Sequence, residues 1–353
     1  MPVPTTNTKF SEIQTEFGGS NPIQLSEYYA GGPLVPAGTP APNGPIPASG
    51  QISVGQFRGS AKALEADYLV IAGGGGGSSP NAGGGGAGGV RFSAYGPAPL
   101  NSGSKLSLGS GTYPVTIGAG GAPGGYPVPG GPGSTRGGDS IFNPGGSEGS
   151  NKITATGGGT DYSDPGGNLR PGGSGAGPTG WCAIPAGAGN TPPFSPPQGN
   201  PGGTPGGAAG AAGGGGAGQP GFNGGAFSPT GGDGGAGVAI NISGTPTYYG
   251  GGGGSGSDNR GYCSKNGAGG IGGGGSGPGG PGSANTGGGG AGGRFQGPSG
   301  GSGGSGRIQI RVPAADAPLI SVSPPTNTFT TVPAPAGGGS IANFTVSGTL
   351  TVA

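Results

Sequence analysis

The segment Tyr68–Val312 decides the fold, because it opens with Tyr68-Leu-Val-Ile-Ala-Gly-Gly-Gly-Gly-Gly77 and closes with Gly306-Arg-Ile-Gln-Ile-Arg-Val312. Between these two apolar runs the chain is mostly glycine. Glycine and proline, 103 and 40 of the 353 residues, together make up about two fifths of the chain. This share exceeds the roughly 25–30% that is typical of disordered sequence. Disorder is therefore the first hypothesis that the pattern of glycines has to exclude.

The glycines come in runs of similar length, and proline, asparagine or serine separates the runs. Ser78-Ser-Pro-Asn-Ala82, between Gly73–Gly77 and Gly83–Gly89, is typical of a turn, since Pro and Asn favour chain reversal. In polyproline II geometry, at about 3.1 Å per residue, such runs form straight rods of roughly 15 to 22 Å. Because glycine has no Cβ, the rods can approach closely enough for N–H···O bonds between them. We therefore expect a bundle of polyglycine II rods, and not collagen, which requires glycine at every third residue.

Short period-two segments within the same region predict the strands that hold the rods in place. Each alternates apolar and polar residues, as an antiparallel sheet with one solvated face does. They are Val90–Ser93, Lys105–Leu108, Tyr113–Ile117, Ser140–Phe142, Lys152–Thr156, Gly237–Ile242 and Arg307–Val312. The expected fold is mostly β: antiparallel β-sandwich strands that frame a bundle of polyglycine II rods at residues 67–312.

Residues 1–66 contain less glycine and predict a head with short helices, followed by a Pro-rich linker over Pro33–Ser49. Three segments, Phe10–Phe17, Leu25–Tyr29 and Ile52–Phe57, each combine apolar residues with a serine and end near glycine. Ser11 with Gln14, and Ser53 with Gln56, fit the capping box that begins a helix. Helices this short are marginal alone, so they require a partner surface.

Composition argues against several classes of function. Hydrophobic residues make up 29% of the chain and charged residues 7%, with a net charge of +1 and no histidine. Such weak charge does not predict binding to nucleic acid or to anionic lipid. The N-terminal residues have no signal-peptide pattern, and no apolar run is long enough to span a membrane, so we expect neither export nor membrane insertion.

The sequence also predicts no enzyme and no cofactor. The many Gly-x-Gly matches lack the strand, helix start and following acid of a dinucleotide site. Asp161 with Asp164, or Asp233, is more typical of turn chemistry than of an acid and base pair. Cys182 and Cys263 have no neighbouring Cys or His, which excludes a zinc site. Two alternatives stay open for these cysteines: a disulfide between two connections, or two reduced thiols.

Aromatic residues that interrupt glycine or proline are the better candidates for binding. Flat rings on a rigid bundle suit sugar faces and interface anchors; the alternative is that each ring caps the bundle or fills a seam. The receptor-binding candidates are Tyr126, Trp181, Phe194, Phe222, Phe227 and Tyr262. Tyr248 and Tyr249 are more typical of a strand.

After Pro313 the composition changes again. Leu319–Ser323, Asn327–Thr330 and Ile341–Ser347 predict two or three strands of a partial β domain at residues 313–353. They resemble the beginning of a BACON-type β-sandwich, which could not close within these residues. Two explanations stay open: a longer product, or strands that pair with another chain.

Two further resemblances concern the rest of the chain. Phe10-Ser-Glu-Ile-Gln-Thr-Glu-Phe-Gly-Gly-Ser-Asn-Pro-Ile-Gln-Leu-Ser-Glu-Tyr-Tyr-Ala-Gly-Gly32 is similar to the opening of tail-fibre and other virion proteins of tailed bacteriophages, especially marine and cyanobacterial ones. It departs at Ala30, where that family often has Arg. The order of strands and polyglycine over Tyr68–Val312 resembles the glycine-rich domain of phage fibres. It is also similar to a glycine-rich module of some receptor tyrosine kinases and, more loosely, to adhesins at the tips of long tail fibres.

The resemblance implies a virion tail fibre or fibre-tip adhesin, made in the host cytoplasm and carried on the virion exterior. Its partners would be tail or baseplate proteins at the head, and a host surface glycan or outer-membrane protein at distal turns; a homotrimer is compatible. The virion-attachment candidates are Phe10, Ile13, Phe17, Leu25, Tyr28 and Tyr29. These residues could instead pack on one another or around a three-fold axis. The alternative function is a structural virion component, such as a capsid decoration fibre or baseplate connector, without receptor binding.

Overall fold

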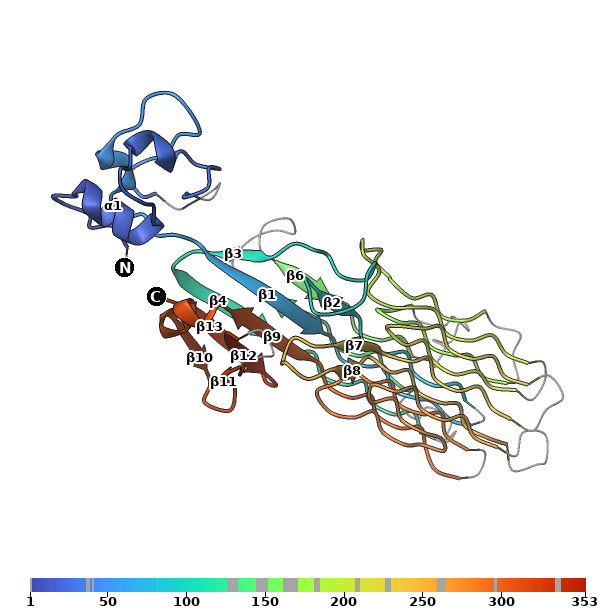
Figure 1. Ribbon diagram of the computed structural model, residues 1–353. Helices are drawn as coiled ribbons and strands as arrows, with labels where there is room; N and C mark the ends of the chain where they lie inside the picture. The colour runs from blue at the N-terminus through green and yellow to red at the C-terminus, as the bar shows by residue number, and fades with distance from the viewer. Residues whose placement is uncertain are drawn as a thin grey trace.

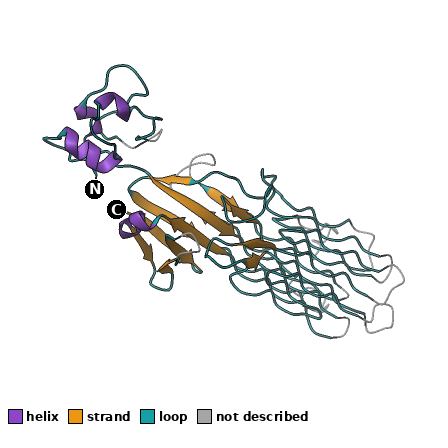
Figure 2. Ribbon diagram, in the orientation of Figure 1, coloured by secondary structure: helices purple, strands orange, loops and turns teal. Residues whose placement is uncertain are grey.

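The computed structural model describes residues 2–35, 39, 41–80, 82–125, 133–143, 152–160, 171–180, 185–206, 210–225, 230–258, 265–294, 297–333 and 338–353. Three parts follow one another along the molecule: a small N-terminal head, a β-sandwich, and a long bundle of extended rods (Figure 1). The C-terminus lies at the end of the sandwich that is nearest the head. The strands lie at the base of the bundle (Figure 2), so the predicted mostly β fold is confirmed.

The head is built from α1 (Phe10–Phe17), η1 (Leu25–Tyr28) and η2 (Val54–Phe57). Ile13, Tyr28 and Phe57 are fully buried at its centre. The rings of Tyr28 and Phe57 meet edge to face with 6.1 Å between their centroids. All described members of this core precede Arg58, so the head has an apolar core of its own.

One of the two predicted capping boxes is confirmed and the other is wrong. Ser53 N–H donates to Gln56 Oε1 at 2.7 Å, as expected. In α1, however, Lys9 N–H donates to Glu12 Oε2 at 2.6 Å, so the box lies two residues before the predicted Ser11. A carboxylate is a stronger acceptor than an amide oxygen, which favours Glu12 over the predicted Gln14 as the residue that reaches back.

Two antiparallel sheets form the sandwich, with strand orders β11-β12-β9-β1-β2 and β10-β13-β4-β5-β6, and β3 pairs with the first half of β1. The hairpin β7-β8 is separate. The bounds are β1 Leu64–Ile71, β2 Val90–Phe92, β3 Leu106–Leu108, β4 Gly111–Thr116, β5 Ser140–Phe142, β6 Ile153–Ala155, β7 Val238–Ile240, β8 Thr247–Tyr249, β9 Arg307–Val312, β10 Ile320–Ser323, β11 Thr328–Thr331, β12 Ser340–Phe344 and β13 Gly348–Val352; η3 spans Ala314–Leu319. The strands predicted from alternation are confirmed.

β1 separates two apolar layers. Ala66, Tyr68 and Val70 belong to the core between the sheets, whereas Leu69 and Ile71 belong to a second cluster that includes residues of the β7-β8 hairpin. A strand with apolar contacts on both faces has a sequence that is a nearly continuous run of apolar residues. This is the physical reason for the Tyr-Leu-Val-Ile sequence.

The strands after Pro313 correct one expectation. Instead of a partial domain of their own, or strands that pair with another chain, they complete the sandwich within this chain. β12 pairs with β9, with Ala342 opposite Ile310, and β13 pairs with β4, with Leu350 opposite Tyr113. Phe344 and Leu350 are fully buried in the core between the sheets. Without these strands, β9 and β4 would each have one open edge.

The glycine runs form the predicted rods and bond to one another with a period of three. Gly73 and Gly76 donate to Gly138 and Thr135 of one neighbouring rod, each at 3.0 Å. Gly74 and Gly77 donate to residues 304 and 301 of another rod, each at 2.9 Å. Three residues per turn is the geometry of polyglycine and polyproline II. The described runs are therefore neither wandering coil nor α-helix.

The rod at residues 73–77 has six neighbouring rods, as in hexagonal packing. Its amides donate to the rods at 83–89, 133–138 and 300–304, and its carbonyl groups accept from the rods at 118–124, 156–160 and 287–293. An isolated rod of this type has no internal hydrogen bonds. The neighbouring rods therefore supply the hydrogen-bond partners that the backbone of an α-helix finds within the helix itself. The bundle thus satisfies buried peptide groups without a large apolar core.

Candidate functional site

The rod bundle has two ends with different surroundings. At the sandwich end, rods continue directly into strands: Ala72 N–H donates to Gly89 O, and Gly306 N–H donates to Gly118 O. The other end, here called the far end, points away from the sandwich and the head. There, Gly124 N–H donates to Gly77 O at 2.9 Å. Any side chain at the far end is held as far from the head as this fold allows.

Only part of the predicted receptor-binding set can be placed. Phe194 and Phe222 are described, whereas the other candidates and both cysteines lie outside the described residues: Tyr126, Trp181, Cys182, Phe227, Tyr262 and Cys263. Phe222 is 55% exposed. Its own amide donates to Asp233 O and its carbonyl accepts from Gly213 N–H, so its ring projects from a rod and not from a turn.

Phe194 belongs to a connection at the sandwich end, not to a distal turn. The guanidinium of Arg91, on β2, lies over its ring at 4.1 Å from the centroid, and Arg91 also donates to Thr154 O on β6. Asn190 holds the same connection, because its side chain accepts from Phe194 N–H and donates to Phe194 O, both at 3.1 Å. The ring therefore packs against the sandwich, which agrees with the alternative that it fills a seam and does not bind a receptor.

The virion-attachment candidates contribute to the core of the head. Ile13, Phe17 and Tyr28 are buried, and Phe10 and Leu25 pack against them. Tyr29 is half-buried and its hydroxyl donates to Gly50 O. These residues thus pack on one another, which was one of the alternatives. Attachment of the head to another protein stays a prediction, and it would use the outer surface of this core.

Tyr28 makes the stability of the head depend on pH. Its hydroxyl donates to Gly18 O at 2.8 Å. Burial raises the pKa of Tyr28 above the ordinary 10.0, and the carboxylate of Glu27 adds to the shift. The unfolded chain therefore releases this proton at lower pH than the folded chain does, so the stability conferred by the neutral phenol is complete below pH 10.0 and declines as the pH rises through the folded pKa.

We expect Tyr28→Phe to lower the free energy of unfolding of the head by about 1 kcal/mol at neutral pH, since one hydrogen bond is lost. Above pH 10.0, the variant should decline less steeply with pH than the wild type. Guanidinium unfolding of both proteins, followed by circular dichroism across that range, measures the difference. Equal slopes would show that Tyr28 does not titrate with folding. The comparison with Phe cancels the contribution of every other tyrosine.

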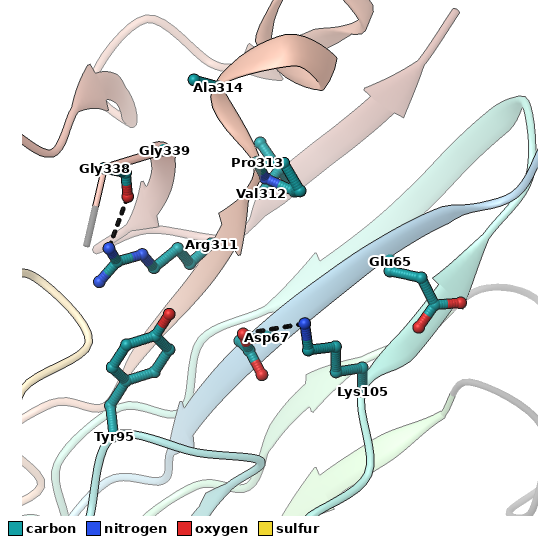
Figure 3. A pocket seen from close by; sticks show the side chains of 10 residues that line it. All are labelled: Glu65, Asp67, Tyr95, Lys105, Arg311, Val312, Pro313, Ala314, Gly338 and Gly339. Atoms are coloured by element: carbon teal, nitrogen blue, oxygen red, sulfur yellow. Dashed lines mark hydrogen bonds and ion pairs between the residues drawn. The ribbon is translucent and has the colours of Figure 1, made fainter. Parts of the chain in front are cut away.

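A pocket of about 350 Å³ with four charged side chains in its lining opens on the outer face of the sandwich (Figure 3). Strands β1 and β9 and the connection after β2 supply its charged and aromatic side chains, and the backbone around Pro313 and Gly339 supplies the rest. Its lining residues are Glu65, Asp67, Tyr95, Lys105, Arg311, Val312, Pro313, Ala314, Gly338 and Gly339. No pocket was predicted from the sequence at this place.

Cross-strand pairing explains why opposite charges meet there. Asp67 on β1 lies directly opposite Arg311 on β9. Asp67 accepts from Ser93 Oγ at 2.9 Å and lies 3.9 Å from Lys105 Nζ. The signal that could have revealed the site is the pair of acids at alternate positions, Glu65 and Asp67, which share one face of a strand. Arg311, however, lies more than 200 residues further along the chain, so its proximity to these acids could not be read from the sequence.

The described residues contain no helix that is long and apolar enough to cross a membrane. Within the same residues, no group of three or more His, Cys, Asp or Glu side chains is arranged to hold a metal ion.

Rods that bond through their peptide groups, framed by thin sheets, define a glycine-rich β-protein. Residues 49–313, about three quarters of the chain, match the family model described as a glycine-rich domain. The chain therefore belongs to the glycine-rich domain family. No curated protein and no solved structure gives a significant match. The family match ends before β10–β13, although these strands complete the sandwich.

Proposed function

We propose that the chain is a virion protein of a tailed bacteriophage, a tail fibre or fibre-tip adhesin, which is anchored by its head and binds a host-surface receptor through the far-end connections. The observation that carries this proposal is the bonding within the bundle. Rods such as 73–77 are held by peptide groups of six neighbours, so the side chains of the connections are not needed to keep the rods in register. Connections on such a scaffold can vary in sequence without loss of the fold.

Under this proposal, the head meets other virion proteins of the tail or baseplate, and the far end meets a host surface glycan or an outer-membrane protein. The protein is made in the host cytoplasm and resides on the exterior of the virion. It acts by binding, without enzymatic activity, cofactor, nucleic acid or membrane insertion. Three copies can associate in one fibre. The similarity of residues 10–32 to phage fibre proteins supports attachment through the head.

The test replaces the connections at residues 126–132 and 181–184, which include Tyr126 and Trp181, by Gly-Ser segments of equal length. We expect binding of the purified chain to host cells to fall at least about tenfold, or 1.4 kcal/mol, with an unchanged unfolding temperature. The matched control is Gln219→Ala, an exposed position in another turn, which should leave binding unaltered. Undiminished binding by the replaced chain would contradict receptor recognition by these connections.

A separate experiment tests attachment by the head. Deletion of residues 1–32 should yield particles that lack the protein, whereas particles that carry it at normal copy number would rule out attachment through the head. A chain that needs its head for incorporation, yet binds no host cell and leaves host range unchanged after exchange of the connections, would instead be a structural virion component.

A further inference from the structure

The pocket on the outer face of the sandwich has no part in the proposed function, since it lies at the base of the bundle and not at the far end. It combines two acids, Glu65 and Asp67, with two cationic side chains, Lys105 and Arg311. Its volume of about 350 Å³ lies at the lower end of the range of small-molecule sites, ~300–1,000 Å³. The space thus suits a ligand of about one sugar ring.

The aromatic residue of the pocket is fixed before any ligand arrives. Tyr95 has a left-handed backbone with φ 65°, which is uncommon for a residue with a bulky side chain. Its carbonyl accepts from Asn241 N–H at 2.7 Å. The guanidinium carbon of Arg311 lies over the ring, 4.5 Å from the ring centroid. Arg311 in turn donates to Ile242 O at 2.8 Å and to Gly338 O at 2.5 Å. Tyr95 nevertheless remains 38% exposed, so a preorganised aromatic surface faces solvent.

The acid beside this ring is also oriented. Asp67 is 8% exposed, and Ser93 donates to its Oδ1. Its other oxygen lies 3.9 Å from Nζ of Lys105, whose side chain is 52% exposed. An ion pair at this distance, with one of its partners exposed to solvent, contributes little to stability. Asp67 Oδ2 and Lys105 Nζ can therefore be bridged by a group that donates to the carboxylate and accepts from the ammonium.

A hydroxyl group is such a bridge, because it is both donor and acceptor. A charged ligand would be attracted by the two side chains of opposite charge in the pocket and repelled by the two of like charge. An uncharged polyol is repelled by neither pair. We propose that this pocket binds one unit of a neutral saccharide: its apolar face lies against the exposed part of Tyr95, and neighbouring hydroxyls bond Asp67 and Lys105. The site is independent of the far-end connections, so the chain would carry two separate binding regions.

The experiment uses the full chain and arrays of immobilised oligosaccharides in three groups: neutral hexose polymers, uronic- and sialic-acid polymers, and polymers of free amino sugars. We expect at least one of the neutral hexose polymers to bind. Tyr95→Asn, which removes the ring while asparagine tolerates the left-handed backbone, and Lys105→Gln should each reduce this binding at least tenfold. The matched control is Tyr248→Ala, an exposed tyrosine on β8 outside the pocket, which should bind as the wild type does.

Three outcomes would overturn the proposal: no binding to any neutral polymer, binding to charged polymers alone, or neutral binding that survives both pocket variants in folded protein. Thermal unfolding of each variant establishes that it is folded, and Asp67→Asn provides a third variant of unchanged size. The exchange of the far-end connections separates this inference from the proposed function. That exchange should reduce binding to host cells at least about tenfold and leave binding to the neutral polymer intact. The pocket variants should reduce binding to the neutral polymer and leave binding to host cells through the far-end connections intact.

Discussion

Replacement of Gly75 by alanine should lower the free energy of unfolding by about 3 kcal/mol or more, which is the upper range for overpacking of a rigid interior. Gly75 lies in the middle of a rod with six neighbours, and a Cβ at this position would lie 1.9 Å from Gly159 O and 2.7 Å from the carbonyl carbon of the same residue. The obstacle is backbone, so no side chain can rotate away. The rods at 73–77 and 156–160 would have to separate, and hydrogen bonds between them would lengthen or break.

Guanidinium unfolding measures the loss, and amide hydrogen exchange shows where it occurs. In the variant, exchange should accelerate at Gly158, whose N–H donates to Gly73 O, and at Gly86, whose N–H donates to Gly159 O. The matched control is Gly125→Ala. No atom lies within 4 Å of a Cβ at Gly125, so its effect should stay within about 0.5 kcal/mol. Equal stability of the two variants would contradict close packing of the rods.

Phe344→Ala should destabilise the sandwich by about 3–5 kcal/mol, as truncation of a buried phenylalanine does. Phe344 is fully buried on β12, in the core between the sheets. Domains of this kind have about 5–15 kcal/mol of stability in total, so the variant should unfold at a much lower denaturant concentration. Because the rod at 73–77 continues from β1 and the rod at 300–304 leads into β9, the bundle should lose its protection from hydrogen exchange in the same transition.

The control for this prediction lies two residues further along the chain. Val346 is 41% exposed, and Val346→Ala should change the free energy of unfolding by no more than about 0.5 kcal/mol. If Phe344→Ala unfolded at the wild-type denaturant concentration, the strands after Pro313 would have to be an addition to a sandwich that is already complete. A chain that ends at Pro313 provides the same test in stronger form, because it leaves β4 and β9 with open edges.

Several parts of this structure could be predicted from the sequence because they depend on local properties. A run of glycines has no Cβ and no helix-forming side chains, so extended rods with bonds between them were predictable from residues such as 73–77 alone. The alternation in Arg307–Val312 likewise predicts a strand. The spacing of serine and glutamine correctly predicts the capping box at Ser53 but also predicts one at Ser11, whereas α1 is capped at Lys9, which carries no typical capping side chain.

The pocket could not be predicted, because it is assembled from distant parts of the chain. Asp67 and Arg311 are 244 positions apart, and only the pairing of β1 with β9 places them opposite each other. Phe194 illustrates the same limit. It interrupts proline and glycine as a distal turn residue would, yet its connection lies at the sandwich end under Arg91. A rod runs equally well in either direction, so the spacing of turns does not reveal which end of the bundle a turn occupies.

The amino-acid sequence by itself determined that this chain has rods, strands and a helical head, since each of these follows from the side chains, or their absence, within a few residues. Which rods touch was decided only in the tertiary structure. Gly75 bonds to Gly86 and Gly290, but nothing distinguishes these glycines from the others, because peptide groups are identical along the chain. The sandwich makes the choice for the rods that adjoin its strands, because the pairing of β1 with β2 and β9 brings the rods at 73–77, 83–89 and 300–304 side by side. The described rods between β6 and β7 and between β8 and β9 follow one another without a strand of the sandwich, so hydrogen bonds to neighbouring rods place them.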